Sequence, residues 1–139
     1  HPLEWRTLIT EQLIDFIRSH LSQLGGLTPA RKLAALCEAF GVRTAWHRPG
    51  DVSPVGHAAN LHLDLACHNF GIQEIGHIGE PLREVFPGTP ELRDGYLWAN
   101  DEPGFGIEID EAKAARYPVE LSPIAWTQSR WPDGTAWTP

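Results

Sequence analysis

The stretch of residues 42–65, VRTAWHRPGDVSPVGHAANLHLDL, decides how this chain folds. A short apolar run over 42–46 ends at His47, and a polar loop rich in Gly and Pro follows it. A helical pattern then opens at about His57. In α/β proteins, the side chains at the carboxyl ends of parallel strands face the ligand crevice. The stretch therefore predicts an α/β fold in which His47 stands where such proteins place functional groups.

Residues on both sides of this stretch repeat the same arrangement of strand, loop and helix. Periodicity and turn signals predict elements that alternate along the chain: helix 4–13, strand 14–21, helix 28–40, strand 42–47, helix 57–67 and strand 70–75. The order is αβαβαβ, which is typical of a parallel sheet with helical crossovers. The pattern changes beyond Glu80, where irregular chain, a short helix over 111–117 and a Trp-rich tail are expected.

Polar side chains end each of the three predicted strands: Arg18, His47 and Glu74. Their spacings of 29 and 27 residues are close to the length of one βα unit. Such a period brings the three residues together at one rim of a parallel sheet. By themselves, Arg18 and Glu74 also fit a structural ion pair, and His47 also fits a structural histidine. The sequence thus predicts a cluster and leaves two readings of its purpose.

Composition limits the class of protein. The formal net charge is −7 and the pI is near 5.4, which argues against a nucleic-acid-binding surface, because such a surface needs basic residues to neutralise phosphates. No apolar run approaches the roughly 20 residues that a membrane span needs. Cys37 and Cys67 both fall in helical patterns. A disulfide between them is possible, but we predict two buried, reduced thiols in a cytoplasmic protein.

Three parallel strands are too few for a closed barrel, which needs about eight strands and 250 residues. An open sheet of three strands also leaves two edges exposed, and parallel sheets are normally covered on both faces. Either the chain is the last part of a larger barrel or it is completed by a partner, and we favour the first. The absence of any Met supports a fragment of a longer protein.

Long runs of the sequence resemble the mannonate dehydratase family of the enolase superfamily. They are LIDFIRSHLSQLGGLTPARKLAALCEAFGVRTAWH (13–47), PGDVSPVGHAANLHLDL (49–65) and NFGIQE (69–74). The family includes mandelate racemase/muconate lactonizing-like and starvation-sensing proteins. The resemblance implies a modified TIM barrel whose sixth, seventh and eighth strands lie in residues 1–90. Residues 91–139 would then be the C-terminal segment, which in that family returns to an N-terminal capping domain.

The resemblance also implies an activity: the Mg²⁺-dependent dehydration of D-mannonate or D-gluconate to a 2-keto-3-deoxy sugar acid. Carried over position by position, Arg18, His47, Asp51 and Glu74 match substrate-contacting residues. The metal ligands and the acid and base of the family lie upstream, so no catalytic or metal-binding residue is expected in this chain. The expected partners are the sugar acid, the preceding part of the same protein and, when complete, further copies in a homo-oligomer.

Arg48 departs from the family, which usually has Gly between the His and the Pro of this loop. We expect a bulky cation at the pocket rim, where it would narrow the pocket or add a carboxylate contact. This departure leaves a second hypothesis open, that the protein is a relative that binds or regulates without catalysis. A third hypothesis is that the chain is a fragment with no activity of its own.

Two further expectations concern groups outside the cluster. His57, His62, Asp64 and His68 share a helical stretch, but their spacings do not converge on one face as helical metal ligands do. The inner faces of the strands are expected to carry large apolar side chains that only a complete barrel covers: Ile14, Phe16, Trp46, Phe70 and Ile72.

Overall fold

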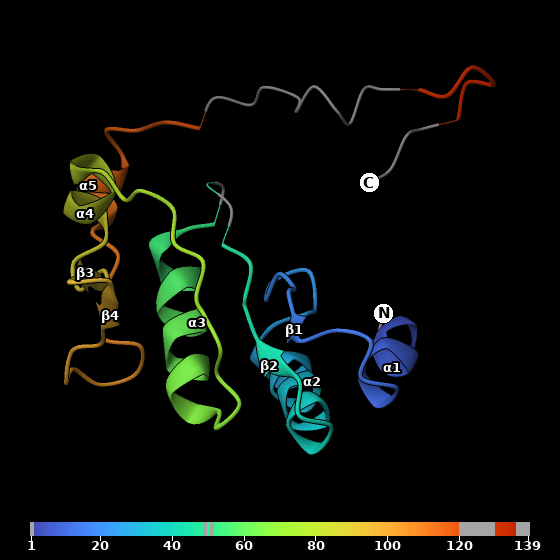
Figure 1. Ribbon diagram of the computed structural model, residues 1–139. Coiled ribbons are helices and arrows are strands. Elements are labelled where there is room, and N and C mark those ends of the chain that lie inside the picture. The colour runs from blue at the N-terminus through green and yellow to red at the C-terminus, as the bar shows by residue number, and fades with distance from the viewer. Residues whose placement is uncertain (1, 49, 51, 120–129, 136–139) are drawn as a thin grey trace.

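The computed structural model describes residues 2–48, 50, 52–119 and 130–135. Its elements follow one another in chain order: α1 Pro2–Thr10, β1 Phe16–Ile17, α2 Leu27–Ala39, β2 Arg43–Thr44, α3 Pro54–Ala66, α4 Glu80–Val85, β3 Glu91–Arg93, β4 Tyr96–Trp98 and α5 Glu111–Ala114. The order from α1 to α3 is the predicted alternation of helices and strands. Figure 1 shows α2 beside the β1–β2 pair, and the elements after α3 grouped on the far side of that helix.

The first two strands form the predicted parallel pair, with Phe16 opposite Arg43 and Ile17 opposite Thr44. Single parallel bridges extend the layer, one from His20 to His47 and another from Thr44 to Phe70. Both strands are much shorter than the predicted 14–21 and 42–47. Regular pairing is therefore confined to the middle of the layer, and isolated bridges continue it.

The third predicted strand, 70–75, is wrong as a regular element. After the bridge at Phe70, the amides of Gly71 and Ile72 both donate to the Thr44 carbonyl, at 3.1 and 3.2 Å. Two donors on one acceptor interrupt the ladder, in the manner of a bulge. The segment nevertheless stays beside β2, because the side-chain amide of Gln73 donates to the Trp46 carbonyl at 3.1 Å. The predicted place of this segment is right although its regular pairing is not.

Helix α3 begins at Pro54, three residues before the predicted start at His57. Ser53 is its N-cap, and its hydroxyl accepts the Gly56 amide at 3.4 Å. A capping Ser followed by Pro at the first helical position is a strong start signal. Helix α2 begins at Leu27 after the N-cap Gly26, one residue before the predicted start at residue 28.

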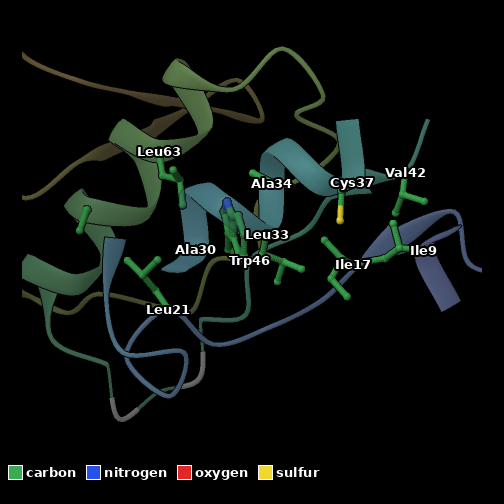
Figure 2. Close-up of a cluster of buried hydrophobic side chains, with 11 residues drawn as sticks. Ile9, Ile17, Leu21, Ala30, Leu33, Ala34, Cys37, Val42, Trp46 and Leu63 are labelled. Carbon is green, nitrogen blue, oxygen red and sulfur yellow. The ribbon is translucent and has the colours of Figure 1, made fainter. Parts of the chain in front are cut away.

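A single cluster of buried side chains forms the core between the strands and their helices (Figure 2). It consists of Ile9, Ile17, Leu21, Ala30, Leu33, Ala34, Cys37, Val42, Trp46, Ala59 and Leu63. Trp46 is fully buried here, so the expectation that it faces a barrel interior is wrong. Side chains alternate along a strand, and Trp46 shares the helix side with the buried Thr44.

The opposite face of the strand layer is open. Phe16 is 38% exposed, Phe70 43% and Ile72 62%, as expected for side chains that a complete barrel would cover. Ile14 is different, because it is partly buried against the core. The Arg43 guanidinium stacks over the Phe16 ring, with 4.3 Å from its carbon to the ring centroid. The open face therefore keeps large apolar groups in water.

The chain beyond Glu80 is more regular than predicted. Helix α4 is formed where no clear periodicity was found. The antiparallel hairpin β3–β4 gives regular pairing to a region where irregular chain with short extended pieces is expected. The hairpin turns at Asp94-Gly95, both with positive φ, as the tight turns of hairpins require. Helix α5 ends at Ala114, earlier than the predicted Tyr117. The Trp-rich tail falls largely outside the described residues.

Cys37 and Cys67 are free thiols in the structure, the first buried and the second partly buried. Burial raises the pKa of the Cys37 thiol to about 11, so it is held in the unreactive protonated form. Within the described ranges, no helix is long and apolar enough to cross a membrane.

Candidate functional site

The three strand-end residues lie together on the open face. Arg18 follows β1, His47 lies beyond β2 at the bridge to His20, and Glu74 comes from the extended segment after Phe70. The parallel pairing of these segments places their carboxyl ends at one edge. The sequence prediction that Arg18, His47 and Glu74 are neighbours is therefore confirmed.

The contacts among the three side chains are short. Arg18 Nη2 donates to both Glu74 oxygens at 3.0 Å. His47 Nδ1 lies 2.5 Å from Glu74 Oε2 and 2.6 Å from Arg18 Nη2. A ring nitrogen either donates or accepts, so Nδ1 cannot satisfy both neighbours at once. Its closer neighbour is the carboxylate, which favours an Nδ1–H directed at Glu74 and leaves Nε2 as the acceptor.

The cluster is accessible and strongly charged. The side chains of Arg18, His47 and Glu74 are 58%, 29% and 42% exposed. The backbone amide of Arg48 donates to Glu74 Oε2 at 3.0 Å, and this bond does most to lower the pKa of Glu74, to about 2. Hydrogen bonds from His47 and Arg18 act in the same direction. Glu74 is therefore an ionised acceptor at any physiological pH, beside the permanent donors of Arg18.

The side chain of Arg48 is not at the pocket rim, so that expectation is wrong. It is 2% exposed and lies on the helix side of the layer, against Gly76. His47 faces the open side, and its neighbour in the sequence points the opposite way, as alternation along an extended chain requires. Arg48 thus reaches the site through its backbone amide and not through its side chain.

His20 was not predicted as a site residue. Its ring meets that of His47 edge to face, with centroids 5.8 Å apart and an interplanar angle of 74°. Its Nδ1 accepts from the Ser22 amide at 3.3 Å and lies 2.9 Å from the Ser22 hydroxyl. The available signal was the alternation that puts Arg18 and His20 on one face of the first strand. His20 supports one side of the His47 ring.

Asp51, the remaining predicted site residue, lies outside the described residues. Across the described ranges, no three His, Cys, Asp or Glu side chains are arranged to hold a metal ion. The carboxylate in the cluster, Glu74, is already held by Arg18, His47 and the Arg48 amide. His57, which belongs to the histidine group of α3, is fully buried. These residues do not fit a magnesium ion by themselves.

Comparison with known proteins assigns a class to this arrangement. Residues 1–113 match the family described as enolase C-terminal domain-like. The chain belongs to that family, and its fold is that of the C-terminal part of an enolase-superfamily TIM barrel.

Individual relatives narrow the comparison. A D-galactonate dehydratase family member of Salmonella enteritidis is 60% identical over 136 residues, which are 98% of this chain and 32% of that protein. The family member RspA of Pantoea ananatis is 57% identical over 136 residues, 98% of this chain and 33% of its own length. The chain spans about a third of the length of the curated relatives it matches.

Solved structures agree with this assignment. A crystal structure of an enolase from Pantoea ananatis, with bound D-gluconate and Mg, superposes with a TM-score of 0.89 at 55% identity. It covers 100% of this chain and 34% of that one. A mandelate racemase/muconate lactonizing enzyme from Jannaschia sp. CCS1 gives a TM-score of 0.73 at 29% identity, over 85% of this chain and 31% of that one.

Proposed function

We propose that the longer protein that carries this chain is a Mg²⁺-dependent sugar-acid dehydratase, and that Arg18, His47, Asp51 and Glu74 bind its substrate. D-Mannonate and D-gluconate are the proposed substrates, and a 2-keto-3-deoxy sugar acid is the product. The observation that carries the proposal is the convergence of Arg18, His47 and Glu74 on an open face, with contacts of 2.5–3.0 Å. The relative that holds D-gluconate and Mg supports the class of ligand.

The cluster offers complementary groups for a polyhydroxylated acid. Arg18 supplies a planar cation that suits a carboxylate or a pair of hydroxyls. Glu74 accepts hydrogen bonds from hydroxyl groups, and its low pKa keeps it an acceptor. His47, with Nδ1–H on Glu74, would present Nε2 to a hydroxyl proton. In the free protein these groups bind one another, and a sugar acid would replace part of that network.

The chemistry also needs groups that this chain does not supply. Removal of a proton next to a carboxylate builds negative charge on its oxygens, which a divalent cation stabilises when bound. The described residues do not form a site for that cation, so we place its ligands, and the acid and base, in the preceding part of the protein. The contribution of this chain is to hold and orient the sugar chain.

A relative that binds without turnover is the second candidate. It is favoured because the cluster offers groups that bind a sugar acid, whereas the described residues form no metal site. Exposed ion pairs stabilise proteins by only about 0–1 kcal/mol, so structure alone gives little reason to gather these charges on an open face. A homo-oligomer and a cytoplasmic location remain predictions under either reading.

Calorimetry and a product assay on the longer protein separate these readings. Mg²⁺ and a panel of sugar-acid epimers are titrated first, and 2-keto-3-deoxy product is then measured. We expect binding and turnover for the wild type, and a loss of at least about 100-fold in kcat/KM for Glu74→Gln, which forfeits a charged contact worth about 3 kcal/mol. Glu91→Gln, on the exposed β3, is the matched control. Binding without product would establish the silent relative.

A further inference from the structure

Arg48 is a cation buried where a cation is unusual. Its side chain is 2% exposed, although Arg is almost never fully buried unless paired. It lies on the side of the layer away from the substrate cluster, so direct substrate contact does not explain it.

Two residues lie near the buried guanidinium of Arg48. At Gly76 a Cβ atom would collide with Nη1 of Arg48, so a larger residue there would require the guanidinium to shift. His57, in the first turn of α3, is fully buried and close enough to Arg48 for the charge of the guanidinium to affect it. Burial lowers the pKa of His57 to about 4, and the nearby charge of Arg48 adds to the effect. His57 is therefore neutral and does not repel the guanidinium.

The backbone of Arg48 acts on the site directly. Its amide donates to Glu74 Oε2, and this bond is the largest influence that lowers the pKa of Glu74. The Glu74 charge in turn raises the pKa of Arg48, against the effect of burial, and such an attraction between charges is mutual. The same residue thus gives Glu74 a hydrogen bond from the main chain, while the charge of its side chain is itself stabilised by Glu74.

From this geometry we infer that Arg48 is a positioning residue for substrate binding: its buried guanidinium anchors the amide that holds the Glu74 carboxylate ready for a sugar hydroxyl. The inference deepens the proposed function and rests on it for the role of Glu74. A guanidinium that merely fills space would stabilise the fold and leave substrate affinity and pH dependence unchanged. The two roles are therefore distinguishable.

The test uses the longer protein with three variants. Arg48→Met removes the charge and keeps the length, Arg48→Lys keeps a charge, and Gly76→Ala displaces the guanidinium without altering any charge. For Arg48→Met we expect a rise of about tenfold in KM for D-gluconate with little change in kcat, equivalent to one pKa unit or about 1.4 kcal/mol. Gly76→Ala should reproduce this loss, and Arg48→Lys should retain most of the affinity.

The pH profile gives a readout that a structural role does not move. The charged groups around Glu74 are Arg18, His47 and Arg48, and only the last is changed. The acid limb of kcat/KM should therefore move to higher pH in Arg48→Met and Gly76→Ala. Wild-type KM and an unmoved acid limb in both variants, with normal melting temperatures, would overturn the inference.

Crystal structures of the four proteins keep this result separate from the proposed function. If the wild type converts no sugar acid, the dehydratase proposal fails, and the position of Glu74 then decides the inference. We expect Oε2 within hydrogen-bond distance of the residue 48 amide in the wild type and Arg48→Lys, and displaced in the other two. An unmoved Glu74 in Arg48→Met would refute the anchoring role.

Discussion

Two carboxylates on opposite sides of the strand layer show how differently the two faces are built. Glu74, on the open face, has a pKa lowered to about 2, chiefly by the Arg48 amide and then by His47 and Arg18. Asp64, on α3, is 6% exposed, and burial raises its pKa to about 8. Neither of its oxygens has a hydrogen-bond partner among the described residues. The open face stabilises charge, whereas the packed face penalises it.

The apolar residues of the two faces differ in the same way. On the packed side, Trp46 is fully buried and belongs to the core cluster with residues of α2 and α3. On the open side, Phe70 and Ile72 stay largely in water beside a charged cluster. A face that combines charged groups with exposed large apolar groups is typical of a surface that another part of a protein covers. The comparison therefore predicts which measurements change when the rest of the barrel is present.

The largest effect expected is the difference between the isolated 139 residues and the longer protein. Each large apolar side chain left in water forgoes about 1.5–3 kcal/mol, and Phe16, Phe70 and Ile72 together approach a domain's whole stability. We expect the isolated chain to be aggregated, molten or oligomeric, and to dehydrate nothing. Light scattering, near-ultraviolet circular dichroism and a keto-acid assay test this. A monodisperse monomer with cooperative melting and turnover would contradict the interpretation that the chain is the last part of a larger barrel.

A smaller effect separates the two faces by mutation in the longer protein. Trp46→Ala should lower the free energy of unfolding by about 3–5 kcal/mol, and Ile72→Ala by about 2–4 kcal/mol once the barrel covers that face. Leu65→Ala, at a position 69% exposed on α3, is the matched control and should cost under about 1 kcal/mol. Denaturant unfolding measures all three. An Ile72→Ala cost no greater than that of the control would show that the open face stays uncovered.

The buried carboxyl of Asp64 makes the stability of the fold depend on pH. Its folded pKa of about 8 lies above its ordinary value of 3.8, so the unfolded state releases the proton first as pH rises. Asp64 therefore destabilises the fold increasingly between about pH 4 and pH 8. Asp64→Asn should be neutral near pH 4 and increasingly stabilising up to about pH 8, by about 1.4 kcal/mol for each pKa unit between the folded and unfolded values, because asparagine carries no charge to bury. Melting temperatures across that range measure it, and a pH-independent difference would contradict it.

Features that follow from the regular spacing of residues could be predicted from the sequence. Features that depend on how distant segments pack against one another could not. The spacing of Arg18, His47 and Glu74 was sufficient because parallel pairing brings strand ends together whatever the length of the strands. Trp46 was assigned to the wrong face of the strand layer because a large apolar residue fits either the barrel interior or the core beneath the helices. Arg48 was misplaced because the space that receives it depends on Gly76, which lies 28 residues further along the chain.

The smallest effect expected concerns His47 and asks whether it binds substrate or removes a proton. Some families of the superfamily pair a His after the seventh strand with an Asp after the sixth, and the residue at that position here is Arg18. The structure supplies a different carboxylate, because Glu74 Oε2 lies 2.5 Å from His47 Nδ1. Glu74 is shared with Arg18 and the Arg48 amide, so it is not a dedicated partner that would activate the imidazole.

We therefore predict that His47 is a substrate ligand and not the primary base. In the longer protein, His47→Asn should lower kcat/KM about tenfold, equivalent to about 1.4 kcal/mol and consistent with one lost hydrogen bond to substrate. Exchange of the substrate α-proton with deuterium oxide, followed by NMR, should stay detectable, because the base lies elsewhere. His62→Asn, in the middle of α3 and outside the cluster, controls for general effects of losing a His. Complete loss of exchange with unchanged substrate binding would instead identify His47, oriented by Glu74, as the base.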